Sequence, residues 1–422
     1  MNTILEAVEL VNDNKIEEAL TLLKKYVPKA NDDEKFTISE LYLKWGFLDE
    51  AEKILTELLK KYPDESDLKL SLADIYIEKE DDASAINVLA EIEEDDPAYV
   101  QALLQLADLY EAQGLFEVAE QKLFAAKQKL PNEVIIDFAL GELFYSIGEF
   151  NKAVIYYEKV AKEHDTLADV SIKDRLAESL AGIGEYERAL DYFKTGSDKS
   201  PDKFFKYGVT AEQAGRNDIA ISCWKRVLEL DPYYHSVYEN LANALKEEGM
   251  LEEAYDMAKQ GLEQDSFNKE LYLTCAKLAR ELDNDEEVEE YIREAVALDP
   301  DFLEATLFFL EFLKEEDRHS DIIELLTSIK STGSAEPMYD WELARAYREE
   351  ELYDEALASY RDAYLNLYED TDFLKEYGYF LTEEGRKAEA IDVFKKYLAI
   401  LPHDYTVEEF LYRLESEDYE GG

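Results

Sequence analysis

The sequence predicts an all-α solenoid of about twelve helix-turn-helix units followed by a capping helix. The first of three features that predict it is a small or β-branched residue returning about every 34 positions, which we call the marker residue of its unit. Eight of the eleven intervals between markers are 34 residues long. A repeat of this length is typical of stacked helix pairs. The markers are Ala19, Ala51, Ala85, Ala119, Ala153, Ala189, Ala220, Ala254, Val288, Ile322, Ala356 and Ala390.

The second feature is another row of small residues, twelve positions before the markers, which predicts close packing between the two helices of each unit. Leu310 is the one large residue in this row. Val288 and Ile322 stand where alanine is expected among the markers, so we expect looser packing in the ninth and tenth units. The row is Ala7, Ser39, Ala73, Ala107, Gly141, Ala177, Gly208, Ala242, Ala276, Ala344 and Gly378.

The third feature is a turn signal in each unit. Seven units carry a glycine five positions before the marker, where it ends the first helix. Seven of the nine prolines lie twelve positions after a marker, where the next unit begins. Proline is tolerated in the first turn of a helix and is costly further inside. The glycines are Gly46, Gly114, Gly148, Gly184, Gly215, Gly249 and Gly385.

Leu140-Gly141-x-x-Phe144, followed by Ala153-x-x-x-Tyr157, resembles the tetratricopeptide repeat (TPR). The resemblance covers residues 1–404 and is to a bacterial cytoplasmic multi-TPR protein. It implies a right-handed superhelix whose first helices line a concave groove. It also implies that the residues eleven and eight positions before each marker point into that groove.

The spacing predicts three parts along the chain. Residues 1–199 hold units one to six and residues 200–404 hold units seven to twelve, with a joint expected in the loop-forming stretch 195–201. A merely shortened helix is the alternative at this joint. Residues 405–415 read as an amphipathic capping helix, and residues 417–422 as a disordered acidic tail.

Charge and composition exclude several classes of partner. The chain has 99 Asp and Glu against 45 Lys and Arg, a formal net charge of −54. Nucleic acids and anionic membranes are bound through Lys and Arg, so neither is expected as a partner. Two cysteines, no signal peptide and no long apolar run favour a cytoplasmic location. The charge is explained equally well by a highly soluble surface or by a preference for basic partners.

No catalytic or metal-binding constellation is recognisable. The four histidines lie far apart, with no cysteine or second histidine at ligand spacing. No phosphate-binding glycine loop or nucleophile elbow is present in the sequence. We therefore expect no enzyme activity and no cofactor.

The charge of the residues at the groove positions changes sign along the chain. Units two to seven carry an acidic row and units eight to eleven a basic stripe, although the second half of the chain is the more acidic overall. The acidic row is Glu40, Asp74, Asp108, Glu111, Glu142, Glu178 and Glu212. The basic stripe is Lys246, Lys277, Arg280, Lys314, Arg345 and Arg348.

Two interpretations of the basic stripe remain open. It is a ligand-binding surface, or one side of a ladder of ion pairs between layers, because a glutamate directly follows four of its members; the two interpretations are compatible. These glutamates are Glu247, Glu281, Glu315 and Glu349. The acidic row likewise fits a plain solvated face. Trp341, Tyr145, Tyr379 and Asn243 are candidate aromatic or polar anchors, with Trp341 the preferred one.

These observations favour a non-catalytic scaffold or adaptor that binds a protein segment, possessing a basic part, in its groove. Two alternatives are a regulatory sensor for a short peptide and an acidic mimic that competes with nucleic acid. A two-carboxylate clamp for chaperone C-termini is disfavoured, because Glu239 stands where the first lysine of such a clamp is needed.

Overall fold

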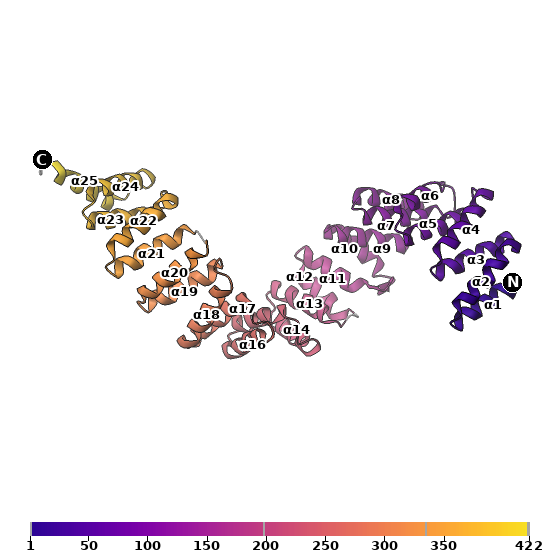
Figure 1. The fold of residues 1–422 in the computed structure, drawn as a ribbon, viewed down its shortest axis with the longest axis horizontal. Helices are drawn as coiled ribbons and strands as arrows, with labels where there is room; N and C mark the ends of the chain where they lie inside the picture. The colour runs from indigo at the N-terminus through magenta and orange to yellow at the C-terminus, as the bar shows by residue number, and fades with distance from the viewer. Residues whose placement is uncertain (1, 197–198, 334–335, 420–422) are drawn as a thin grey trace. The chain divides into compact units, whose positions relative to one another are not determined.

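The computed structural model describes residues 2–196, 199–333 and 336–419, and within these ranges it is almost entirely helical (Figure 1). The helices follow one another as antiparallel neighbours joined by short turns. In chain order the elements are α1 (Asn2–Asn12), α2 (Ile16–Tyr26), the 3₁₀ turn η1 (Val27–Lys29), α3 (Asp32–Lys44), α4 (Leu48–Lys61), α5 (Ser66–Glu78), α6 (Asp82–Ala90), α7 (Tyr99–Ala112), α8 (Phe116–Lys129), α9 (Val134–Ser146), α10 (Phe150–Val160), β1 (Thr166–Leu167), β2 (Val170–Ser171), α11 (Ile172–Gly182), α12 (Tyr186–Thr195), α13 (Pro201–Gln213), α14 (Asn217–Leu230), α15 (Ser236–Glu247), α16 (Leu251–Gln264), α17 (Lys269–Glu281), α18 (Asp285–Leu298), α19 (Leu303–Glu315), α20 (His319–Ser331), α21 (Pro337–Glu349), α22 (Tyr353–Leu367), α23 (Thr371–Glu383), α24 (Lys387–Ile400) and α25 (Tyr405–Tyr419).

A left-handed residue ends the first helix of all twelve units. The seven glycines expected there have φ between 70° and 79°. The other five units place a non-glycine residue at the same position with φ between 53° and 60°: Asn14, Glu80, Asp283, Asp317 and Glu351. Because left-handed backbone is uncommon for such residues, its recurrence confirms twelve helix-turn-helix units.

The two rows of small residues form the contact between the helices of a unit. Ala153, the fifth marker, is completely buried, and Gly141 lies against the ring of Tyr157. A Cβ atom on Gly141 would come within 2.8 Å of that ring. The small residue therefore leaves room for a large aromatic side chain four positions after the marker. Ala153 and Tyr157 both belong to one buried cluster of α7–α12.

The expectation of loose packing is confirmed for the tenth unit and is wrong for the ninth. The pair α19–α20 in the tenth unit makes far fewer contacts than α21–α22 in the eleventh unit, but α17–α18 in the ninth unit packs closely. The ninth unit keeps Ala276 opposite Val288, whereas the tenth has large residues on both helices, Leu310 and Ile322. One large residue is thus accommodated, and two hold the helices apart.

A small hairpin explains the one interval of 36 residues. β1 and β2 pair antiparallel between α10 and α11, with Leu167 opposite Val170. Ala168 and Asp169 form the turn with positive φ. The hairpin was not expected from the sequence, because two-residue strands carry too few residues for an alternating pattern.

The chain forms two compact units, residues 1–216 and 217–422. The expected division at 199/200, within the loop between α12 and α13, stays a prediction.

The last helix has the expected capping role. Val407, Leu411 and Leu414 of α25 are buried in the cluster formed with α21–α24. The helix extends to Tyr419, so the expectation of a disordered tail from residue 417 is wrong for residues 417–419. Residues 420–422 lie outside the described residues.

No helix in the described ranges is long and apolar enough to cross a membrane. Cys223 and Cys275 are free and buried, as expected for core residues. Burial raises the pKa of both thiols to about 12, which makes them poor nucleophiles at neutral pH.

Candidate functional site

The first helices of neighbouring repeats contact one another directly, as seen for α3 with α5, α7 with α9 and α15 with α17. Elements on the inner side of a curve lie closer together than those on its outer side. These contacts therefore place the first helices on the inner face of each compact unit. The acidic row and the basic stripe both lie on first helices.

Four members of the basic stripe lie in the last turn of their helices: Lys246 of α15, Arg280 of α17, Lys314 of α19 and Arg348 of α21. A cation at this end of a helix interacts favourably with the helix dipole, typically by about 0.3–1 kcal/mol. Local helix stability therefore favours these residues independently of any ligand.

The stripe also forms ion pairs between layers. Lys246 Nζ lies 2.6 Å from Glu281, and Arg280 donates to Glu315 at 2.5 Å. In both pairs a residue eight positions before one marker meets a residue seven positions before the next. Lys277 pairs with Glu304 at 2.5 Å. These residues therefore form ion pairs between layers, as the ladder interpretation proposed.

The other glutamates that follow stripe residues make different contacts. Lys314 pairs at 2.5 Å with Glu342, which is buried, rather than with Glu349. Glu349 pairs instead with its chain neighbour Arg348 at 3.3 Å. Glu247 accepts a hydrogen bond from Asn217 at 2.9 Å.

A second pairing rule connects the positions eleven before one marker with those fourteen before the next. Arg345 pairs with Glu376 at 2.6 Å, and Glu178 with Lys206 at 2.6 Å. Arg175 donates to both carboxylate oxygens of Glu142 at 3.0 and 3.1 Å. Asp74 follows the same rule, because it accepts a hydrogen bond from Gln105 at 2.7 Å.

Arg175 and Lys206 were missed by the sequence reasoning, which examined only the positions eleven and eight before each marker. Both lie fourteen positions before a marker, and this shared spacing is the signal that identifies them. Together they neutralise part of the acidic row on α9 and α11. The acidic character of that row is therefore weaker in the fifth and sixth units than the sequence indicated.

Acidic groove positions remain in the second to fourth units. Glu40 lies exposed on α3, and Glu111 of α7 accepts a hydrogen bond from Ser146 at 2.7 Å. Asp108 of α7 has no such partner in sequence, because Ala139 stands fourteen positions before the next marker, where other layers carry a polar residue. Although water reaches Asp108, surrounding protein raises the pKa of its carboxyl, and the nearby Glu111 adds to this effect. Glu212, on α13, also has an interaction partner.

The aromatic candidates are engaged in packing. Trp341 is 8% exposed, lies edge-on to Phe373 at 5.4 Å and donates to Glu376 at 3.0 Å. Tyr379 contacts Phe394 and Phe410 at centroid distances of 5.2 and 5.0 Å. Trp341 therefore offers little surface to a ligand in this conformation.

Tyr145, by contrast, is half-buried and takes part in the charge network of its unit. Its hydroxyl donates to Glu178, and the guanidinium of Arg175 lies 4.3 Å from the centre of its ring. Burial and the hydrogen bond to Glu178 raise the pKa of Tyr145 to about 12.

Asn243 lines a polar pocket of about 240 Å³ on the first helices of the eighth to tenth units. The pocket combines Lys246 and Lys277 with the carboxylates of Glu239, Glu270 and Glu304. Burial raises the pKa of Glu239, and the charges of Glu270 and Glu304 add to this effect.

The side-chain amide of Asn243 forms no hydrogen bond with another described residue. Thr274 stands where other layers supply a partner to this groove position. Its amide can both donate to and accept from a polypeptide backbone.

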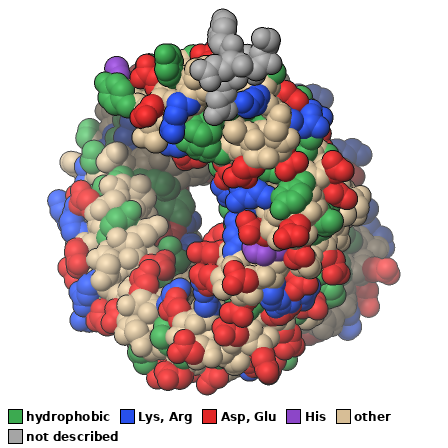
Figure 2. Space-filling model, turned by 90° about the vertical axis from the view of Figure 1, so that its left-hand side faces the viewer, with side chains coloured by type: hydrophobic (Ala, Val, Ile, Leu, Met, Phe, Trp, Pro, Cys, Tyr) green, Lys and Arg blue, Asp and Glu red, His purple; other side chains and the backbone are tan. Residues whose placement is uncertain are grey.

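No group of His, Cys, Asp and Glu in the described ranges has the geometry of a metal site. Figure 2 shows that Asp and Glu side chains are spread over most of the face in view, with Lys and Arg side chains between them. The chemistry available at this surface is charge pairing and hydrogen bonding.

Comparison with known proteins identifies the family. The chain is 42% identical over 420 residues to the TPR repeat-containing protein YpiA of Bacillus subtilis, and the match covers 99% of each chain. The chain belongs to the YpiA-like TPR family. Family models agree: residues 337–404 match the C-terminal tetratricopeptide repeats of YpiA-like proteins and residues 111–165 match their tetratricopeptide repeats. Residues 2–113 match the ARM repeat of tetratricopeptide repeat protein 21.

Solved structures similar to this YpiA-like chain include a TPR protein. YrrB, a TPR protein with an unusual peptide-binding site, aligns with 43% of this chain and 95% of its own at 20% identity and a TM-score of 0.38. The Naa15/Naa10 complex bound to HypK-THB aligns with 92% of this chain and 66% of its own at 15% identity and a TM-score of 0.45.

Proposed function

We propose that this YpiA-like protein is a non-catalytic cytoplasmic scaffold or adaptor that binds a segment of another protein along its first helices. TPR repeat proteins generally act in protein interaction, which supports a polypeptide ligand. The observation that carries the proposal is the pocket at Asn243. There an amide without a partner lies between two lysines and three carboxylates on the inner face.

The ion-pair ladder is compatible with binding. Exposed pairs such as Lys246–Glu281 contribute only about 0–1 kcal/mol each, so a carboxylate of a partner can replace the internal glutamate at low cost. We propose that an acidic part of the segment contacts Lys246, Lys277 and Arg280. A basic part would contact the unneutralised acidic positions, Glu40, Asp108 and Glu111. Neither nucleic acid nor membrane is a proposed partner.

Affinity capture with cross-linking from cytoplasmic extract tests this function. The test variant changes Lys246, Arg280, Lys314 and Arg348 together to Glu, and a second variant carries Asn243→Ala. The matched control changes Lys225, Lys259, Arg361 and Lys395 to Glu; these lie on second helices and also pair with glutamates.

We expect the test variants to lose partners that the control retains, with helical content unchanged. Equal capture by all variants would refute binding through the stripe.

A further inference from the structure

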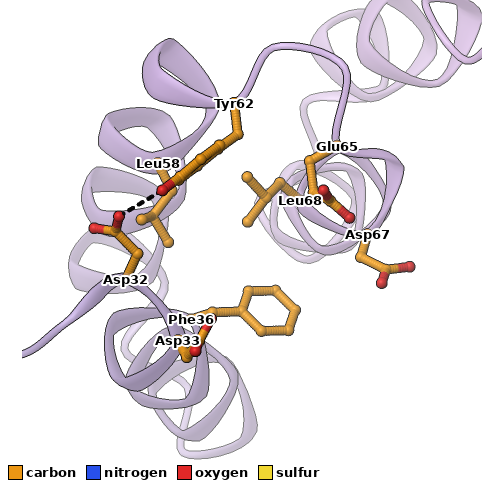
Figure 3. A pocket seen from close by; sticks show the side chains of 8 residues that line it. All are labelled: Asp32, Asp33, Phe36, Leu58, Tyr62, Glu65, Asp67 and Leu68. Atoms are coloured by element: carbon orange, nitrogen blue, oxygen red, sulfur yellow. Dashed lines mark hydrogen bonds between the residues drawn. The ribbon is translucent and has the colours of Figure 1, made fainter.

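A second pocket, of about 370 Å³, lies in the first compact unit between α3, α4 and the start of α5 (Figure 3). Its apolar lining consists of Phe36, Leu58, Tyr62 and Leu68. Leu58 and Leu68 are 3% and 5% exposed, so they form a fixed floor. Figure 3 shows the rings of Phe36 and Tyr62 on opposite sides of the open space.

Carboxylates surround this apolar space. Asp32, Asp33, Glu65 and Asp67 line the pocket, and neither lysine nor arginine does. Asp32 is neutralised, because it pairs with Lys61 and accepts a hydrogen bond from Tyr62 at 2.7 Å. Figure 3 shows Asp67 pointing away from the space. Asp33 and Glu65 are therefore the charges available to an occupant.

The lysines near this pocket are already engaged. Lys35 pairs with Glu57 at 3.0 Å, and the amine of Lys69 donates to the carbonyl of Glu91 at 3.0 Å. The side chains of Asp33 and Glu65 have no hydrogen-bond or ion-pair partner in the described part of the chain. The pocket thus combines an apolar, aromatic interior with uncompensated negative charge at its edge.

We propose that this pocket binds an arginine side chain of a partner polypeptide. The aliphatic stem would contact Leu58 and Leu68, and the planar guanidinium would lie against an aromatic ring while donating to Asp33 and Glu65. Arginine suits such a site better than lysine, because its guanidinium stacks on aromatic faces and pairs with carboxylates in a planar fork. The inference shares with the proposed function only that the ligand is a polypeptide.

The test uses the full chain and a fluorescein-labelled glycine–serine peptide with a central Leu-Arg-Leu, at physiological ionic strength. Matched peptides replace the arginine with lysine, citrulline or glutamate. Fluorescence anisotropy is expected to show at least about tenfold tighter binding of the arginine peptide than of the citrulline peptide. Equal affinity of the two peptides would overturn the proposal, because citrulline keeps the shape and loses the charge.

Two double variants test whether the arginine peptide binds at this pocket. Asp33→Asn with Glu65→Gln is expected to weaken binding of the arginine peptide by at least about tenfold. The control, Asp13→Asn with Glu117→Gln, makes the same charge change at exposed sites elsewhere in the same compact unit and should bind as the unaltered chain does. Far-UV circular dichroism and melting temperature verify that each variant folds.

Photo-cross-linking of the unaltered chain provides a readout that does not depend on variants. A benzophenone beside the arginine is expected to label residues 32–68. Labelling of residues outside 32–68 would overturn this site. The Asn243 pocket is tested separately by affinity capture, so failure of one proposal is distinguishable from failure of the other.

Discussion

Arg345 donates to both carboxylate oxygens of Glu376, through Nε and Nη2, at distances of 2.6 to 3.0 Å. The pair joins the eleventh unit to the twelfth, and the Tyr360 hydroxyl adds a hydrogen bond to the same carboxylate at 2.7 Å. Burial opposes ionisation of Glu376, but the hydrogen bonds from Arg345, Tyr360 and Trp341 keep its pKa below the ordinary value. In the first compact unit Glu142, Arg175 and Tyr157 form the same arrangement with the charges exchanged.

This exchange predicts that the charges of the Arg345–Glu376 pair can be swapped. Arg345→Glu alone should reduce the free energy of unfolding by about 2 kcal/mol or more, because it places two carboxylates together in a half-buried site. Adding Glu376→Arg should recover most of that loss, since Tyr360 can donate to a glutamate on either helix. Urea unfolding followed by circular dichroism measures both effects.

Arg361→Glu provides the control, because Arg361 pairs with Glu389 at an exposed site. It should reduce the free energy of unfolding much less than Arg345→Glu does, because solvent screens an exposed pair. A swapped double variant as unstable as Arg345→Glu would contradict the prediction.

Lowering the pH should reduce the free energy of unfolding, in part through Glu289. Hydrogen bonds from Arg318 and Arg293 outweigh partial burial and lower the pKa of Glu289 to about 2. A depressed pKa contributes stability above the unfolded value of about 4.3, and this contribution disappears as the pH falls toward 2. Glu289→Gln should therefore cost about 1 kcal/mol at pH 7 and almost nothing at pH 2. Urea titrations at several pH values measure this convergence; parallel curves would exclude it.

Gly141→Ala should destabilise the protein even though alanine favours helices over glycine by about 1 kcal/mol. The added Cβ would meet the ring of Tyr157 at 2.8 Å, so we expect a net loss of about 1–3 kcal/mol. In a Tyr157→Leu background the same substitution should cost much less. A double-mutant cycle of melting temperatures measures the coupling, and an equal cost in both backgrounds would place the strain elsewhere.

Glu351→Gly should stabilise the eleventh unit. Glu351 has φ of 60° at the position where seven units carry glycine. Glycine adopts the left-handed conformation without a steric penalty. The free energy of unfolding is therefore expected to rise by about 0.5–1 kcal/mol, after allowing for the greater freedom of glycine in the unfolded chain. The reverse change, Gly148→Ala, should cost a similar amount. Chemical unfolding compares the two, and a destabilising Glu351→Gly would show that the glutamate side chain contributes more than its backbone costs.

Amide hydrogen exchange should be faster in α19 and α20 than in α21 and α22. The tenth unit has large residues at both close-contact positions, and its two helices touch over a smaller area. Local opening follows low contact density. Mass spectrometry of peptic fragments resolves the two units, and uniform protection across them would contradict this account.

The repeats were predictable because their determinants are local and recur. A small residue opposite a large one and a left-handed residue at the turn each appear at a fixed spacing, so sequence alone locates all twelve units. The looseness of the tenth unit was also visible in Leu310 and Ile322. The ninth was misjudged because the expectation considered Val288 without Ala276, its neighbour across the pair.

The groove was less predictable because its charges depend on contacts between layers. Sequence places Lys314 near both Glu342 and Glu349, and only the direction of its side chain decides between them. Trp341 lies between the core and the groove positions of its helix, so spacing could not show that its ring turns inward. Asn243 was predicted as a polar groove position and lines a pocket there, but whether its amide finds a partner depends on side-chain directions in the next layer.

The two pairing rules also bear on how such a chain changes length during evolution. Lys246–Glu281 and Arg280–Glu315 use the same offset, so a middle layer contributes a base to one neighbour and an acid to the other. Duplicating or deleting one whole layer there would leave every remaining charge with a counterpart. Gene rearrangements in steps of one whole layer are thus tolerated by the electrostatics. An insertion within a helix would shift the two sides out of phase, whereas the hairpin lengthens the interval between α10 and α11 and leaves Glu142 paired with Arg175.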